Sequence, residues 1–158
     1  MKPTVYIETT IPSYYCDTRP ALAKDIARTR EWWDRERQDY ECFTSLFVLE
    51  ELERGNYPTR SACLELMQPL ALLDVSPELD EIAEVYWTNR LMPRPPVRDA
   101  YHVAVASYYR MDYLLTWNCT HLANVNKAIH LEALNARLHL GLPRLVTPEQ
   151  LRPLENYQ

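Results

Sequence analysis

Short apolar runs alternate along the chain with segments in which apolar residues recur at helical spacing. This pattern predicts the order of its strands and helices. Apolar runs with the length of buried strands lie at residues 4–8, 41–45, 70–76 and 112–118, with one more inside 143–151. Apolar positions at helical spacing lie at residues 21–38, 45–55, 59–67, 77–91, 99–111 and 125–139. Residues 9–15, which contain Pro12, and residues 92–97 are expected to be turns or loops. Strands separated by helices predict an α/β fold with a mainly parallel central sheet flanked by helices.

Length and composition narrow the class of protein. The 158 residues contain no repeat, low-complexity run or linker, so we expect a single domain over residues 1–158. The chain has 2 Gly against 12 Pro and lacks both common glycine-rich phosphate-binding motifs, which argues against the usual nucleotide-binding folds. No apolar stretch has the length of a membrane span, and no signal peptide is recognisable. A cytoplasmic protein without a membrane partner is expected.

Cysteines and charge add two further constraints. The four cysteines are widely spaced and form no C-x-x-C pair, so reduced thiols are expected at Cys16, Cys42, Cys63 and Cys119. The formal net charge of −5 argues against broad binding of a polyanion. It permits an enzyme with local nucleic-acid contacts, because a cluster of carboxylates around a cation would itself contribute negative charge.

Acidic and amide side chains occur where the expected strands end and where the next helices begin. Glu8 follows the first strand, Asn118 follows the run "YLLTW", Glu51 lies on the helix after "FTS", and Asp99 opens an Ala-rich helix. Ligands of parallel sheets bind outside the carboxyl ends of the strands, so these four residues are expected to converge. Clustered carboxylates repel one another unless a cation neutralises them, and a hard divalent ion takes oxygen ligands.

Each of these residues also has a purely structural interpretation. Glu8 at a strand end can bind a helix N-terminus, and Asp99 is a favoured residue for capping a helix. Glu51 taken alone is a solvated helix charge, and Asn118 taken alone is a turn former. It is their order and setting, rather than any one residue, that favours a site.

Three segments carry a resemblance to a known family. They are "VYIETTIPSYY", in which an apolar strand runs into an acid and Thr, "TSLFVLEELERG", with Glu-Leu on a helix before Gly, and "RDAYHVAVASYYRMDYLLTWN". In this order they resemble PIN-domain ribonucleases, most closely the toxins of VapBC-type toxin–antitoxin systems.

The resemblance implies a single PIN-like domain and metal-dependent endoribonuclease activity. It implies Mg²⁺ or Mn²⁺ held by Glu8, Glu51 and Asp99, with Asn118 as a neutral fourth member, and Glu50 as the alternative to its neighbour Glu51. It further implies RNA as the substrate, a homodimer, and a protein antitoxin that silences the enzyme.

Two departures from the family pattern keep other functions open. Glu8 stands where the family usually has Asp, and His121 stands where it often supplies a further Asp after Leu-Thr-x-Asn. Both changes predict weaker magnesium binding or a preference for manganese. The alternative is a catalytically weak or inactive PIN-like module that binds RNA or protein, and a third interpretation is a hydrolase of another phosphate ester.

Other residues have two interpretations each. Arg90, Arg94 and Arg98 precede Asp99 and either hold RNA phosphates or belong to a solvated, proline-stiffened loop. Trp32 and Trp33 either form a partner surface, or pack with Trp33 in the core and Trp32 at its edge. His102 is expected to be structural rather than a general base, and His121 lies nearer the candidate site.

Overall fold

A five-stranded parallel sheet forms the centre of the computed structural model, which describes residues 1–95 and 97–153. Its strands are β1 (Thr4–Ile7), β2 (Glu41–Ser45), β3 (Ala71–Leu73), β4 (Tyr113–Leu115) and β5 (Arg144–Val146). They lie in the order β3-β2-β1-β4-β5, and each pairing is parallel. The predicted α/β class with a parallel sheet between helices is confirmed.

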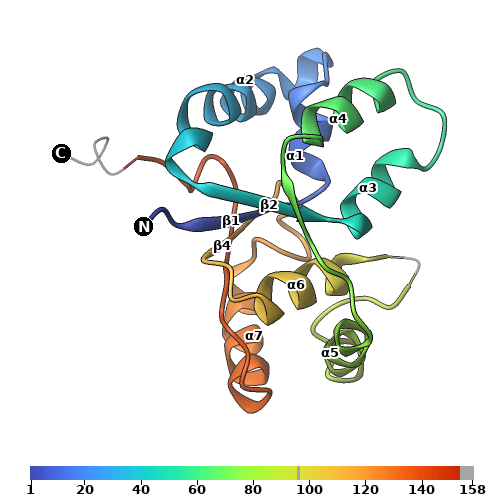
Figure 1. Ribbon diagram of the computed structural model, residues 1–158, viewed down its shortest axis with the longest axis vertical. Coiled ribbons are helices and arrows are strands. Elements are labelled where there is room, and N and C mark those ends of the chain that lie inside the picture. Colours follow the sequence, from blue (N-terminus) through green and yellow to red (C-terminus); the bar gives the residue numbers. More distant parts are fainter. Residues whose placement is uncertain (96, 154–158) are drawn as a thin grey trace.

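Helices cover both faces of this sheet (Figure 1). On one side lie α1 (Thr10–Tyr15), α2 (Ala23–Glu31) and α4 (Arg60–Met67), and on the other lie α5 (Pro77–Thr88), α6 (Asp99–Tyr108) and α7 (Val125–Arg137). The remaining helix, α3 (Leu46–Glu53), continues directly from β2 and contacts both α4 and α6. None of the described helices combines the length and apolar character that a membrane crossing needs.

The sheet extends from the central strand β1 to both sides. The strand's apolar residues Val5, Tyr6 and Ile7 are fully buried, and Val5 lies opposite both Cys42 of β2 and Tyr113 of β4. The chain first adds β2 and β3 on one side of β1, and later adds β4 and β5 on the other. The direction of winding therefore reverses between β1 and β4, and such a reversal opens a crevice at the carboxyl ends of the strands.

The segment after β1 differs from the prediction. Residues 9–15 were expected to form a turn, but Thr10–Tyr15 form the helix α1. Pro12 is its third residue, where a backbone N–H has no partner inside the helix, so the missing donor costs nothing there. Ile11 and Pro12 are buried, and this burial holds the short helix on the core.

The tryptophan pair also departs from prediction. The helix expected over residues 21–38 is regular only in α2, and Trp32–Glu36 form a π-helical turn. Trp32 was expected at the edge of the core, but it is as deeply buried as Trp33. Two adjacent indoles reach the core together because the wider turn rotates the second ring inward. A partner surface built on this pair is therefore excluded.

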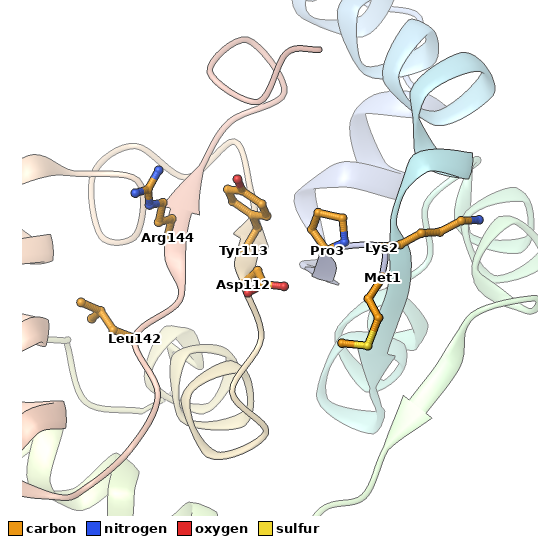
Figure 2. A pocket seen from close by; sticks show the side chains of 7 residues that line it. All are labelled: Met1, Lys2, Pro3, Asp112, Tyr113, Leu142 and Arg144. Atoms are coloured by element: carbon orange, nitrogen blue, oxygen red, sulfur yellow. The ribbon is translucent and has the colours of Figure 1, made fainter. Parts of the chain in front are cut away.

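A hollow at the amino ends of β1, β4 and β5 lies on the edge of the sheet opposite those carboxyl ends (Figure 2). Its one acidic side chain among the described lining residues, Asp112, accepts hydrogen bonds from the backbone N–H and hydroxyl of Thr4, at 2.9 and 3.2 Å. This carboxylate fixes the first residue of β1 to the start of β4. Its bonding is therefore fully accounted for by the fold.

Candidate active site

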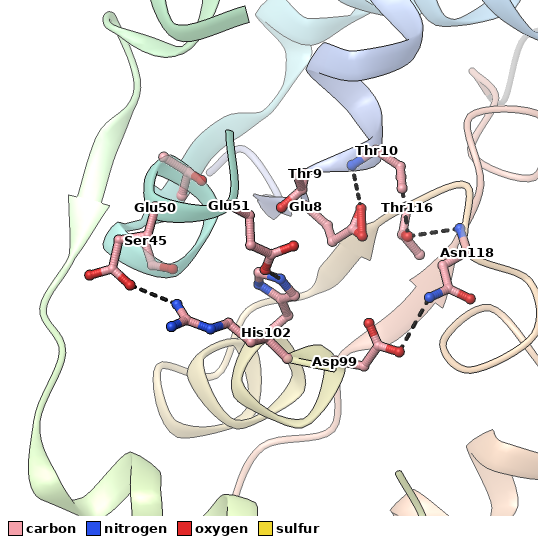
Figure 3. Close-up of polar contacts among 12 residues, drawn as sticks. Glu8, Thr9, Thr10, Ser45, Glu50, Glu51, Asp99, His102, Thr116 and Asn118 are labelled. Carbon is pink, nitrogen blue, oxygen red and sulfur yellow. Dashed lines mark hydrogen bonds and ion pairs between the residues drawn. The ribbon is translucent and has the colours of Figure 1, made fainter. Parts of the chain in front are cut away.

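The four residues singled out in the sequence converge at the carboxyl edge of the sheet. Glu8 follows β1, Asn118 follows β4, Asp99 is the first residue of α6, and Glu51 lies on α3. In Figure 3 the carboxylates of Glu8, Glu51 and Asp99 point into a common space beside His102. Glu8 and Asn118 follow the two strands between which the winding reverses, which is where parallel sheets bind their ligands.

A buried histidine lies at the centre of the group. His102, with 1% of its surface exposed, follows Asp99 by three residues on α6 and so lies on the same helix face. Its Nε2 donates to Oε1 of Glu51 at 2.5 Å, and its Nδ1 lies 2.8 Å from the hydroxyl of Tyr6. That hydroxyl lies 2.7 Å from Oγ of Ser45. A chain of hydrogen bonds therefore joins β2, β1, α6 and α3.

The Glu8 carboxylate is nearly buried, with 3% of the residue exposed. Its Oε1 accepts a hydrogen bond of 2.6 Å from the backbone N–H of Thr10, the first residue of α1. The structural interpretation of Glu8, a contact with a helix N-terminus, is therefore also realised. Burial raises the pKa of Glu8, and the neighbouring His102 and Thr10 offset this only in part.

Asp99 and Asn118 contact each other across the crevice. Nδ2 of Asn118 lies 3.4 Å from Oδ2 of Asp99, and Oδ1 of Asn118 accepts from the backbone N–H of His121 at 2.9 Å. Asp99 does not cap α6, because the capping position is Arg98 and no side chain bonds there. Burial raises the pKa of Asp99, while the charges of His102 and His121 act in the opposite direction.

The two adjacent glutamates of α3 face different surroundings. Glu50 is exposed and its carboxylate pairs with Nη1 of Arg98 at 2.7 Å. Glu51 instead faces His102 and the other two acids. Burial alone raises the pKa of Glu51, but the hydrogen bond and charge of His102, with help from Thr9 and Arg98, outweigh it and leave the pKa lowered. Glu51 is thus the member of the pair that belongs to the cluster.

Negative charge exceeds positive charge in this cluster. Burial lowers the pKa of His102, but the acids Glu51, Glu8 and Asp99 outweigh burial and raise it. A protonated His102 supplies one positive charge against three carboxylates. Among residues 1–95 and 97–153, no three His, Cys, Asp or Glu side chains are arranged to hold a metal ion together. The donors themselves are carboxylate and amide oxygens, which is the ligand chemistry of Mg²⁺ and Mn²⁺.

Two sets of contacts in the site were not predicted from the sequence. His102 was expected to be structural rather than a general base, but its bond to Glu51 was not foreseen, although its spacing from Asp99 already placed both side chains on one helix face. The hydroxyls of Thr10 and Thr116 accept from the backbone N–H groups of Trp117 and Asn118, at 2.8 and 2.9 Å. The bond from Trp117 to Thr10 fixes the end of β4 against the start of α1, and the bond from Asn118 to Thr116 is a local turn. No sequence pattern signals the first bond, because it joins segments far apart in the chain.

No family model matches this sequence, and no curated protein does. The resemblance to PIN-domain ribonucleases therefore rests on the three sequence segments quoted above. To those segments the structure adds a shared location: the acids of all three segments lie at one edge of one sheet.

Proposed function

We propose that this protein is a divalent-metal-dependent endoribonuclease, a PIN-like hydrolase of RNA phosphodiesters that acts as the toxin of a type II toxin–antitoxin pair. The observation that carries the proposal is the convergence of Glu8, Glu51 and Asp99, with excess negative charge, at the carboxyl edge of a parallel sheet. Such a cluster is stable when a cation joins it. RNA is chosen as the substrate because the three segments resemble ribonucleases.

Each residue of the acid cluster would have its own role in hydrolysis. Glu8, Glu51 and Asp99 would hold the ion, and Asn118 would orient Asp99 through its amide. A bound Mg²⁺ or Mn²⁺ lowers the pKa of its water and stabilises the charge of a phosphoryl transition state. A water oxygen would attack phosphorus, the P–O ester bond would break, and the leaving oxygen would take a proton from solvent. Glu8, whose carboxylate faces the same space, would accept the proton that the attacking water loses.

The hydrogen-bonded chain that ends at Glu51 supports this division. His102 holds one oxygen of Glu51 and leaves the other free for a ligand. Tyr6 and Ser45, both buried, fix the imidazole from behind. A carboxylate held in this way keeps one orientation without a ligand, which lowers the cost of assembling the site.

The test is cleavage of total RNA and of short single-stranded RNAs in the presence of Mg²⁺, Mn²⁺ or EDTA. We expect cleavage that requires a metal and falls at least about 100-fold in Asp99→Asn and in Glu51→Gln. Glu50→Gln is the matched control, because it removes the adjacent exposed carboxylate, and its rate should stay close to wild type. Equal cleavage by all four proteins would indicate a contaminating nuclease and contradict the proposal.

A non-catalytic PIN-like module that binds RNA or protein is the second candidate. The observation that favours it is the bonding of Glu51 to His102 and of Glu8 to Thr10, which already occupies two of the acids. The discriminating measurement is binding of Mn²⁺ by calorimetry. A wild-type protein that neither binds Mn²⁺ nor cuts RNA would establish this second function in place of the first.

The resemblance also leads us to propose a homodimer, a protein antitoxin and a cytoplasmic location. Light scattering of the purified protein tests the dimer, since a monomer at micromolar concentration would contradict it. Co-expression with the product of a small neighbouring gene tests the antitoxin. We expect that product to co-purify with the protein and to suppress its cleavage of RNA.

A further inference from the structure

A groove beside the candidate active site concentrates basic side chains. It lies between the end of α5, the loop that follows α5, and the start of α7. Its described lining residues are Trp87, Thr88, Arg90, Met92, Pro93, Arg94, His121 and Lys127, none of which is acidic. We call this hollow the Trp87–Lys127 groove. Its basic lining contrasts with the net charge of −5 of the whole chain.

The groove is continuous with the acid cluster. His121 belongs to its lining, and the backbone N–H of His121 donates to Oδ1 of Asn118 at 2.9 Å. The other end of the same amide contacts Asp99. Lys127 is tied to the opposite wall, since its ammonium donates to the backbone oxygen of Leu91. A ligand in the groove would therefore lie next to the Asp99 carboxylate.

The structure separates the three arginines that precede Asp99. Arg98 is paired with Glu50 at 2.7 Å, so its charge is already matched. Arg90 and Arg94 line the groove and are exposed. Among the described residues, the carboxylate that pairs with Arg94 is that of Glu84, at 3.6 Å, and both side chains are more than half exposed, so this pair is weak.

An aromatic ring accompanies these cations. The guanidinium of Arg94 lies 6.0 Å from the centre of the Trp87 ring, so both belong to one surface. Trp87 is partly exposed, and its other contact is an edge-on packing with Tyr101. Proteins bind single-stranded nucleic acid with cations that contact the phosphates and with aromatic faces that stack on unpaired bases.

We propose that the Trp87–Lys127 groove binds a single RNA strand on one side of the phosphodiester to be cut, with Arg90, Arg94 and Lys127 on its phosphates and Trp87 against a base. This inference rests on the proposed function and adds the path of the substrate to it. The acid cluster repels phosphates, so the strand needs a cationic surface close by to remain bound.

Backbone conformation provides a matched pair of variants. Arg90 follows the end of α5 with a φ of 59°, and Arg110 follows the end of α6 with a φ of 56°. Glycine is the residue best suited to this left-handed position, so Arg→Gly is compatible with the backbone at both sites. The two substitutions remove the same charge from equivalent positions, one inside the groove and one outside it.

The experiment measures binding of a labelled 12-nucleotide single-stranded RNA by fluorescence anisotropy in EDTA, where no cleavage occurs. We compare Arg90→Gly/Arg94→Gln with the control Arg110→Gly/Arg35→Gln, each of which removes two cations. The groove variant should bind about ten-fold or more weakly at ~0.1 M salt, and its log–log salt dependence should be shallower by about 1.4. The control should bind like wild type.

Other outcomes would overturn the proposal in identifiable ways. Equal weakening in both variants would show that only overall charge matters. Equal binding of duplex RNA, or tighter binding of a poly-glutamate peptide to the same groove, would assign the surface to another ligand. The cleavage assay and the binding assay test different proposals. If the wild-type protein cuts RNA but the groove variant binds RNA as tightly as wild type, the groove proposal fails and the nuclease proposal stands. Wild type that binds through the groove but never cuts refutes the nuclease alone.

Discussion

Two groups of charged side chains lie at buried or half-buried positions within residues 1–95 and 97–153, and they are balanced in opposite ways. In the first, Arg28 and Glu36 are 4% and 8% exposed and form a two-pronged pair, with distances of 2.5 and 2.9 Å. The guanidinium also donates to the backbone oxygens of Pro148 and Leu151, at 2.8 and 3.0 Å. Each charge there is matched within the protein, and the pair attaches the C-terminal segment to α2.

The second group, at the carboxyl edge of the sheet, is left unbalanced. Glu8, Glu51 and Asp99 share His102 as their main counter-charge, and His121 and Arg98 act more weakly on Asp99 and Glu51. Uncompensated buried charge costs stability, so a fold keeps it only where something else makes use of it. The first cluster is matched within the fold, and the second has an excess of negative charge that a cation could neutralise. Four measurements test this difference.

The largest effect on stability is expected in the balanced group. Arg28→Leu leaves Glu36 buried without a partner and should lower the free energy of unfolding by about 3–5 kcal/mol. The double variant Arg28→Leu/Glu36→Leu should recover most of this loss, because no charge is then stranded. Urea unfolding followed by circular dichroism measures both. A loss below about 1 kcal/mol in the single variant would show that the pair is unimportant.

Removal of the counter-charge from the acid cluster should have the next largest effect. His102→Ala strands Tyr6 and Glu51 and leaves a cavity, so we expect a loss of about 2–3 kcal/mol in metal-free protein. The loss should be smaller in an Asp99→Asn background, where one repelling carboxylate is gone. Urea unfolding of the four proteins of this cycle gives the coupling. Strictly additive losses would mean that His102 does not balance Asp99.

Neutralising an acid should have opposite signs in the two groups. Glu36→Gln removes half of a matched pair and should destabilise the protein by about 1–3 kcal/mol. Asp99→Asn removes a repelling charge and should leave metal-free protein unchanged or more stable by up to about 1 kcal/mol. Thermal unfolding in EDTA at pH 7.5 compares them. Equal destabilisation by both substitutions would erase the distinction between the groups.

The pH dependence should be the most modest effect. The pKa values of Glu8, Asp99 and His102 are all raised by folding, so the folded state binds more protons than the unfolded one. Stability from these groups is therefore present at lower pH and is lost as the pH rises through their folded pKa values. Glu51, whose pKa is lowered, acts in the opposite sense only in more acidic solution.

Metal-free protein should accordingly unfold at a temperature a few degrees lower at pH 8 than at pH 5.5, which corresponds to a loss of about 1 kcal/mol in the free energy of unfolding. Addition of Mn²⁺ should raise the unfolding temperature more at pH 8 than at pH 5.5, because the ligands must be ionised. Thermal scans across this range provide the measurement. A stability that rises with pH in EDTA would contradict the charge excess.

The sequence predicted an element correctly where the residues of that segment alone determine its structure. The strand "ECFTS" lies at Glu41–Ser45 as expected, and Gly55, expected to end a helix, has the left-handed φ of 77°. Predictions of element type and length were less accurate where contacts with distant segments determine the structure. The strand expected over residues 70–76 is only Ala71–Leu73, because β3 lies at the sheet edge and pairs with β2 alone. Residues 10–15, expected to be part of a turn, are helical because the core buries Ile11.

The same division applies to the candidate site. Glu8, Glu51, Asp99 and Asn118 were placed at strand ends and helix starts from the sequence, since the geometry of a parallel sheet brings such positions together. The choice of Glu51 over Glu50 needed the orientation of α3 relative to α6, which no local pattern encodes. The hydrogen-bonded chain from Ser45 to His102 likewise depends on the register of β1 against β2.

Because β1 lies at the centre of the sheet, the candidate site can form only late in the folding of the newly made chain. This strand is synthesised before β4, with which it pairs, and β4 ends at residue 115. Pairings between such distant segments form slowly, because a long loop must close before any contact is gained. A nascent chain that stops short of β4 carries all three acids without their arrangement. The proposed nuclease therefore stays inert beside the ribosome that makes it until β4 has emerged and paired with β1.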